Sequence, residues 1–157
     1  MRTFAITLTI IGLFAVAAPS IALAGSTPKC AANSIVGTYG VQTTGFSDFV
    51  PGPVPSRIGD FVPIASVGLI TFTSNGTTGG NETANVGGFV FPFSSTGAYV
   101  INADCTGTLT RSLSIGGAAE VLHLVIVQGG AKILVMSTQP GGRLFTGAME
   151  RLADRDD

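Results

Sequence analysis

Residues 97–137, GAYVINADCTGTLTRSLSIGGAAEVLHLVIVQGGAKILVMS, decide the fold class. Four runs rich in β-branched and aromatic residues are separated by short turns at Ala103-Asp104, Gly116-Gly117 and Gly129-Gly130. Glycine pairs supply the positive φ angles that tight hairpin turns require. The stretch therefore predicts four consecutive antiparallel strands joined by hairpins.

The same pattern continues toward both ends of the chain. There are 22 glycines, and Ser74-Asn75-Gly76 and Pro140-Gly141 mark further turns. Beyond residue 24 there is no long helical stretch of Ala, Leu, Glu and Lys. Reading from turn to turn predicts eight strands. They are Ile35–Phe46, Val62–Thr73, Glu82–Phe91, Gly97–Ala103, Gly107–Ser114, Ala119–Gln128, Ala131–Ser137 and Gly142–Leu152.

Eight sequential strands with short hairpins fit two all-β architectures. One is an antiparallel up-and-down β-barrel, and the alternative is a β-sandwich. A barrel removes the exposed strand edges that promote aggregation, and it needs no long crossover connection. We therefore favour the closed barrel, built by residues 25–157 as a single domain.

The first 24 residues have the form of a secretory signal peptide. Met1-Arg2 provides a positive start, residues 4–18 an apolar run, and Ala22-Leu23-Ala24 the small-x-small pattern that signal peptidase reads. An uncleaved membrane anchor is the alternative, because the apolar run approaches the length of a spanning helix. Cleavage after Ala24 predicts a protein exported to the periplasm or the outside, with no stable membrane anchor afterwards.

The chain has two cysteines, Cys30 and Cys105. In an oxidising compartment such a pair normally forms a disulfide, which leaves no odd thiol. A catalytic cysteine would need a basic setting with a nearby histidine, whereas Asp104 and Thr106 flank Cys105. With a single histidine in the chain, a zinc site lacks ligands. We predict a Cys30–Cys105 disulfide, no metal and no cofactor.

Charge is sparse, and this limits the classes of partner. The formal net charge is −1, charged residues make up 11% of the chain, and no basic cluster is present to neutralise phosphates. Nucleic-acid binding is therefore disfavoured. The runs Val121–Val127 and Ile133–Met136 are apolar on both strand faces. A loop, the amino-terminal segment or a neighbouring subunit must cover one face, so a homo-oligomer is one expectation.

The one long connection is Ser47–Asp60, which has three prolines between positions 51 and 55. Prolines make such a segment extended and stiff. Loops of this length in small domains are often functional. It fits either a lid over one mouth of the barrel or a passive covering segment.

The motif Gly37-Thr38-Tyr39-Gly40 on the first strand, the eight strands and the long first loop resemble the calycin-type barrels, especially lipocalins. They are similar in outline to the allene oxide cyclase and dirigent barrels, whose members hold hydrophobic molecules. The motifs at 68–72 and 97–107 are similar to those of small exported bacterial proteins of uncharacterised family. Lipocalins carry tryptophan where this chain has Tyr39, and the resemblance implies that Arg151 on the last strand stacks over that ring.

The candidate site residues are few. Tyr39, Phe89, Phe91, Tyr99 and His123 are the candidates for binding an apolar ligand, because aromatic walls suit such molecules. His123 and Glu120 are the candidates for catalysis, although no carboxylate pair at a catalytic spacing and no G-x-S-x-G elbow are present.

Three functions remain open from the sequence. The first is an exported barrel that binds a small hydrophobic molecule in its lumen, which predicts an apolar cavity of about a few hundred Å³. The second is a cofactor-free cyclase or isomerase of an apolar substrate. The third is an envelope-associated structural or interaction module with a filled core.

Overall fold

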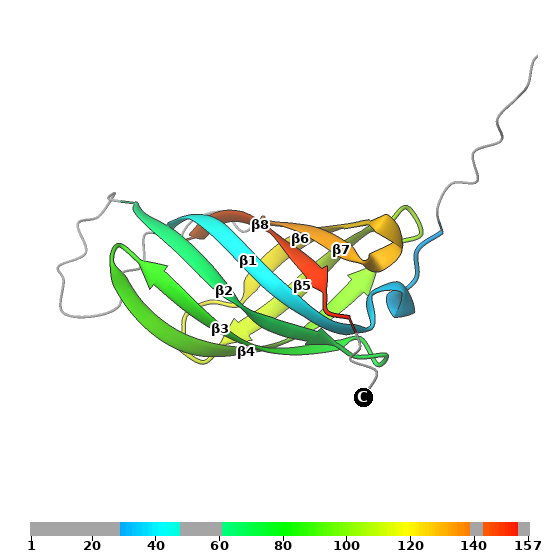
Figure 1. The fold of residues 1–157 in the computed structure, drawn as a ribbon, viewed down its shortest axis with the longest axis horizontal. Helices are drawn as coiled ribbons and strands as arrows, with labels where there is room; N and C mark the ends of the chain where they lie inside the picture. The colour runs from blue at the N-terminus through cyan, green and yellow to red at the C-terminus, as the bar shows by residue number, and fades with distance from the viewer. Residues whose placement is uncertain (1–28, 48–60, 139–142, 154–157) are drawn as a thin grey trace, which may run out of the picture.

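The computed structural model describes residues 29–47, 61–138 and 143–153. In this part of the chain, eight antiparallel strands pair in sequence order and the last pairs with the first, which closes a barrel (Figure 1). The predicted barrel is confirmed, and the sandwich alternative is wrong. The strands are β1 (Gly37–Ser47), β2 (Val62–Phe72), β3 (Thr77–Val86), β4 (Phe89–Ile101), β5 (Thr106–Leu113), β6 (Glu120–Val127), β7 (Lys132–Ser137) and β8 (Arg143–Arg151). Two 3-10 helices accompany them, η1 (Ala32–Ile35) and η2 (Gln128–Gly130).

Alternation along each strand separates lumen from solvent. On β6, Leu122 and Leu124 face the lumen and are fully buried, whereas His123 between them faces outward and is exposed. Successive side chains of a strand point to opposite faces, so a barrel strand contributes every second residue to the interior. This two-residue period is why the sequence pattern predicted the strands.

Two of the predicted strands have wrong bounds. The run Glu82–Phe91 is not one strand, because Gly87 and Gly88 form a hairpin turn with φ of 58° and 96° between β3 and β4. The apolar residues on both sides of this glycine pair gave the appearance of one continuous strand. The predicted strand Gly97–Ala103 is also wrong at its start, because β4 already begins at Phe89, and the other six predicted strands agree with the observed bounds to within two residues.

Glycines inside the strands allow the sheet to curve into a barrel. A Cβ on Gly68 would lie 2.2 Å from the Asn81 carbonyl oxygen, and one on Gly147 would lie 2.1 Å from that of Gln42. Neighbouring strands approach at these points more closely than any side chain permits. These glycines therefore set curvature, in addition to the turn role that the sequence predicted for glycine.

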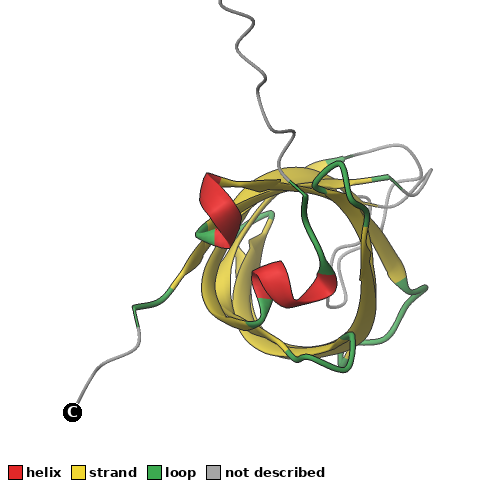
Figure 2. Cartoon of the chain, turned by 90° about the vertical axis from the view of Figure 1, so that its right-hand side faces the viewer, coloured by secondary structure: helices red, strands yellow, loops and turns green. Residues whose placement is uncertain are grey.

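One end of the barrel is closed by the segment before β1. Figure 2 shows η1 lying across this opening. Ile35 is fully buried there. The Cys30–Cys105 disulfide, with 4.9 Å between its Cα atoms, ties the segment to the β4–β5 turn. The predicted disulfide is confirmed, and we call this end the closed end.

The main hydrophobic core lies behind η1. It contains buried residues from β1, β2, β4, β5, β6, β7 and β8. They include Tyr39, Ile70, Phe72, Tyr99, Leu109, Leu122, Leu124, Ile133 and Met149. A smaller cluster around Ala84, Val86 and Phe93 lies toward the opposite end, which we call the open end. No helix among the described residues is long and apolar enough to cross a membrane.

Three sequence predictions lie outside the described residues. They are the signal peptide at 1–24, all but the first residue of the proline-rich connection, and the turn at Pro140-Gly141. They remain predictions.

Candidate functional site

The closed end is organised around Tyr39. The Arg151 guanidinium carbon lies 5.3 Å from the centre of the Tyr39 ring, and its Nη2 donates a hydrogen bond of 2.7 Å to the Tyr39 hydroxyl. That hydroxyl in turn donates to the Gly130 carbonyl at 2.7 Å. Arg151 also donates to the Ser34 carbonyl of η1 at 2.9 Å. The predicted contact of Arg151 with the Tyr39 ring is confirmed, and it joins β1, β8 and both short helices.

Tyr99 and Phe72 complete an aromatic stack at this end. Phe72 packs edge-to-face on Tyr39 and on Tyr99, with ring centres 5.5 and 5.1 Å apart. The Tyr99 hydroxyl donates to the Thr73 carbonyl at 2.7 Å. Burial, and secondarily the proximity of Tyr39, raises the pKa of Tyr99 above its ordinary value. Tyr39 and Tyr99, which were candidates for ligand binding, thus lie in packed core.

The open end contains a pocket inside the barrel. Its lining is mostly apolar and includes several polar and charged side chains. It is lined by Thr43, Ile64, Ser66, Ala84, Val86, Phe91, Phe93, Arg111, Ile115, Glu120, Arg143 and Phe145. About 330 Å³ is free of protein atoms when the part open to solvent is included, but the centre of a water molecule fits in only about 20 Å³. That is room for about one water. A cavity of the predicted size is therefore not preformed.

A network of four charged side chains lies beside this pocket. Arg111 on β5 donates through Nη1 to Glu82 on β3, and through Nε to Glu120 on β6 at 2.8 Å. Arg143 on β8 donates to the other oxygen of Glu120 at 2.7 Å. Glu82 and Arg111 are almost fully buried. The two positive and two negative charges cancel, so the network needs no counter-ion.

Hydroxyl groups extend the network to β2 and β1. Ser66 donates to Glu82 at 2.9 Å, and the hydroxyls of Ser66 and Thr43 are hydrogen-bonded at 2.8 Å. Among the described residues, no buried side-chain nitrogen or oxygen lacks a hydrogen-bond partner. A fully satisfied buried network holds its members rigidly. The arginines are thus held beside the pocket in fixed positions.

Glycines opposite the charged residues make room for them. Gly68 on β2 pairs with Glu82, and Gly97 on β4 pairs with Arg111. A Cβ on Gly68 would come within 2.8 Å of the Glu82 side chain, and one on Gly97 within 3.0 Å of the Arg111 Cβ. The small partner allows the long charged side chain to occupy the lumen.

Sequence reasoning did not select Glu82, Arg111 or Arg143. The available signal was alternation: Arg111 has the same strand parity as Leu109, and Glu82 the same parity as Val86. A charged residue in register with core residues has to be paired. Glu120 was selected for catalysis, but each of its oxygens accepts a hydrogen bond from an arginine.

The remaining candidates lie apart from one another. Phe91 lines the pocket, and Phe89 is at the rim, 44% exposed. His123 is exposed on the outer face of β6, the opposite face from Glu120. The two catalytic candidates therefore do not share a site inside the barrel.

Comparison with known proteins gives structural relatives only. No family model matches the chain, and no curated protein sequence matches it. A redesigned β-barrel, mFAP1 bound to DFHBI, superposes with a TM-score of 0.53 at 18% identity, covering 77% of this chain and 98% of that one. The EF1p2_mFAP2b barrel bound to DFHBI gives 0.54 at 14% identity, covering 81% and 100%. The redesigned barrel b11L5F_LGL gives 0.53 at 20% identity, covering 78% and 96%. These likenesses concern the fold, and they agree with the closed eight-stranded antiparallel barrel.

Proposed function

We propose that this protein binds a small, mainly apolar molecule at the open end of its barrel. The observation that carries the proposal is the pocket itself, in which aromatic and aliphatic walls adjoin a buried, satisfied ion-pair network. Ligand pockets in proteins typically combine an apolar lining with a few fixed polar groups that orient the ligand. The apolar part of the ligand would contact Phe91 and Phe93, and a polar group would reach toward Arg143.

Binding requires the aromatic side chains to move, because the free space is too small for more than a water. The rings of Phe91 and Phe93 lie 6.4 Å apart at a tilt of 47°, and Phe91 is only half-buried. Rotation of a half-buried phenylalanine toward solvent widens the mouth without breaking the ion pairs. We therefore expect binding to open the pocket rather than to fill an existing void.

The structural relatives support the proposal by analogy. Two of the similar designed barrels are bound to DFHBI, a small molecule. Their identity to this chain is 18% or less, so the analogy concerns the fold and does not name a ligand. We also propose that the protein is exported, since the signal-like leader and the disulfide both suit an oxidising compartment.

Native mass spectrometry tests the binding proposal. The mature protein, purified gently from its host, should carry an adduct that disappears on denaturation. Ala84 is buried in the pocket wall, so Ala84→Leu narrows the pocket and should abolish the adduct. The control Ala98→Leu places the same side chain on the exposed outer face of β4 and should retain it. Equal occupancy in both folded variants, or no adduct on the wild-type protein, would contradict the proposal.

A further inference from the structure

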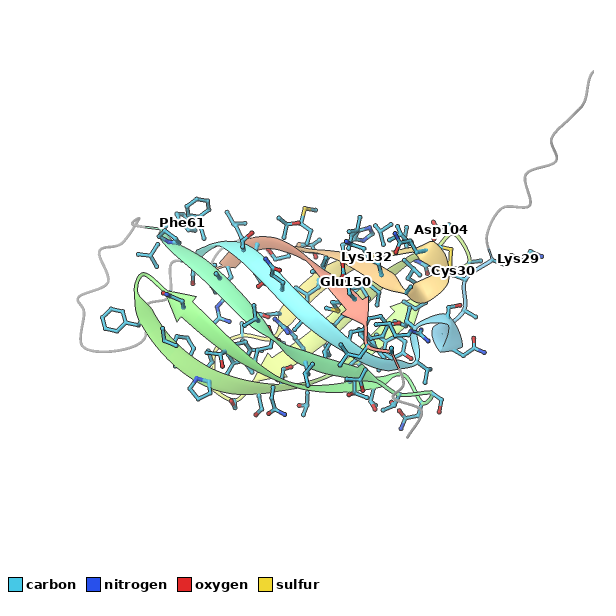
Figure 3. The ribbon with its side chains drawn as sticks, viewed as in Figure 1. Lys29, Cys30, Phe61, Asp104, Lys132 and Glu150 are labelled. Carbon is cyan, nitrogen blue, oxygen red and sulfur yellow. A yellow bond between two sulfur atoms is a disulfide. The ribbon has the colours of Figure 1, made fainter. Side chains whose placement is uncertain are left out.

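Exposed charged side chains gather toward the closed end of the barrel, whereas exposed apolar side chains occur along the whole outer surface and form their largest group at the open end. In the described ranges, the more exposed charged side chains lie toward the closed end, as Figure 3 shows for four of them, whereas the Arg143 side chain at the open end is only 17% exposed. They are Lys29, Asp104, Lys132, Glu150 and Arg151. At the open end, the described charges of Glu120 and Arg143 turn inward and pair with each other.

The open end instead exposes large apolar side chains. Phe61, labelled in Figure 3, lies at the opposite end of the barrel from Lys29 and Asp104. Six such residues, which we call the apolar rim, are between 44% and 67% exposed. They are Phe46, Phe61, Phe89, Val90, Met136 and Leu144. Exposed apolar clusters of this kind mark interaction surfaces.

The rim extends around the mouth rather than over one side of it. Phe46 on β1 pairs with Leu144 on β8, and Met136 is on the adjacent β7. Val90 is on β4, which is the strand furthest from β8 in the closed order of the barrel. Outward-facing side chains on opposite walls point in opposite directions. A second protein copy covers one sector of such a ring, whereas an apolar medium covers all of it at once.

We propose that the apolar rim docks the open end of the barrel onto the surface of a lipid bilayer of uncharged or zwitterionic headgroups. The described charges at the open end, Glu120 and Arg143, pair with each other, and this favours such lipids because no described charge there needs an anionic partner. The charged closed end then points into water. The pocket mouth faces the lipid, but docking does not depend on a ligand.

The outer wall limits the depth of insertion. In the middle of the barrel, Gln42, Asn81 and Thr96 point outward and are exposed, between apolar residues such as Val67 and Leu69. Polar side chains at this level favour water over hydrocarbon. Contact is therefore concentrated at the rim, where the strands end.

Tryptophan probes test the orientation, because the chain contains no tryptophan of its own. Phe89 and Val100 are both exposed on β4, the first at the open end and the second at the closed end. With phosphatidylcholine vesicles, the emission of the Phe89→Trp protein should shift to the blue, and brominated acyl chains should quench it. The Val100→Trp protein should show neither change.

Substitutions in the apolar rim test whether its side chains provide the affinity for lipid vesicles. Phe46→Ser together with Leu144→Ser should lower the vesicle partition coefficient by about 100-fold, about tenfold for each apolar side chain removed from the lipid contact. Val100→Ser is the matched control and should leave partitioning unchanged. Partitioning should also be insensitive to NaCl, because no charge pairing contributes to it.

Three outcomes would overturn the proposal. The first is no response of the Phe89→Trp protein to vesicles, and the second is an equal response of both tryptophan proteins. The third is a concentration-dependent blue shift of the Phe89→Trp protein without vesicles, which would identify a second copy of the chain as the occupant. Circular dichroism and thermal unfolding of each variant establish that the folded barrel is compared throughout.

Discussion

The two ends of this barrel are stabilised in different ways. The closed end combines a disulfide, an edge-to-face aromatic stack and a short helix packed into the opening. The open end contains a charged network beside a small pocket and exposes an apolar rim. One end is thus built from apolar packing and a cross-link, and the other from buried charges.

This contrast bears on which end of the barrel holds the proposed binding site. Buried ion pairs often contribute less stability than well-packed apolar residues of the same volume, because desolvation of the charges opposes their attraction. The apolar core of the closed end shows that this chain can fill its lumen without charges. Positions where a protein does not use the side chains that would stabilise it most tend to occur at functional sites. The contrast therefore supports the open end as the proposed binding site, with the closed end as the structural anchor.

The largest effect should come from breaking the charged network. Arg111→Met removes the group that pairs with both Glu82 and Glu120. Among the described residues, this leaves the buried Glu82 charge with only the Ser66 hydroxyl as a partner, while Glu120 keeps Arg143. We expect the free energy of unfolding to fall by about 3–5 kcal/mol, measured by urea denaturation. The double variant Glu82→Gln, Arg111→Met also removes the buried Glu82 charge, keeps the Glu120–Arg143 pair, and should recover most of the loss. A stable single variant would mean that the network is more hydrated than its burial indicates.

The next effect concerns the closed end. Replacing both Cys30 and Cys105 by alanine opens a loop with a sequence separation of 75 residues. We expect a loss of about 2–4 kcal/mol in the free energy of unfolding, chiefly because the unfolded chain gains freedom. Hydrogen exchange should become faster around η1 and the β4–β5 turn, with the open end unchanged. Uniformly faster exchange would show that the two ends do not behave as separate regions.

A smaller effect should follow from Tyr39→Phe. This change removes a hydroxyl that accepts from Arg151 and donates to the Gly130 carbonyl, and it keeps the ring that packs on Phe72. We expect a loss of about 1–2 kcal/mol in chemical denaturation. Tyr99→Phe is the matched control, because its hydroxyl pairs only with backbone carbonyls and carries no bond to a charged group. A larger loss in the control would place the main polar anchor at Tyr99.

Much of the fold was predictable from local patterns. The two-residue period predicts strands, and the glycine turns predict their order. Two cysteines behind a signal-like leader predict the bridge. The Gly87-Gly88 turn was missed because Val86 and Phe89 on either side continue the apolar pattern.

The site was less predictable, because it is assembled by register. Glu82, Arg111 and Arg143 come from three strands, and only pairing across the barrel brings them to one place. The sequence also does not state which face of an apolar strand is the interior. His123 lies among valines on β6 and yet faces outward. Phe91, which lines the pocket, was a candidate because an aromatic residue suits a pocket wall, and that choice needs no knowledge of the strand register.

The smallest effect is a dependence of stability on alkaline pH at the closed end. Burial raises the pKa of Tyr99 above its ordinary value of 10.0, and the nearby Tyr39 adds to this. The neutral phenol is therefore favoured in the folded state, so its contribution to stability is fully present below about pH 10 and is lost as the pH rises through the folded pKa. Titration of tyrosinate absorbance tests this directly, because the chain has two tyrosines and Tyr39→Phe isolates Tyr99. The midpoint in that variant should stay above 10, since burial is the larger cause. A midpoint at or below 10 in folded protein would show that water reaches the aromatic stack and that the closed end is less tightly sealed than its packing indicates.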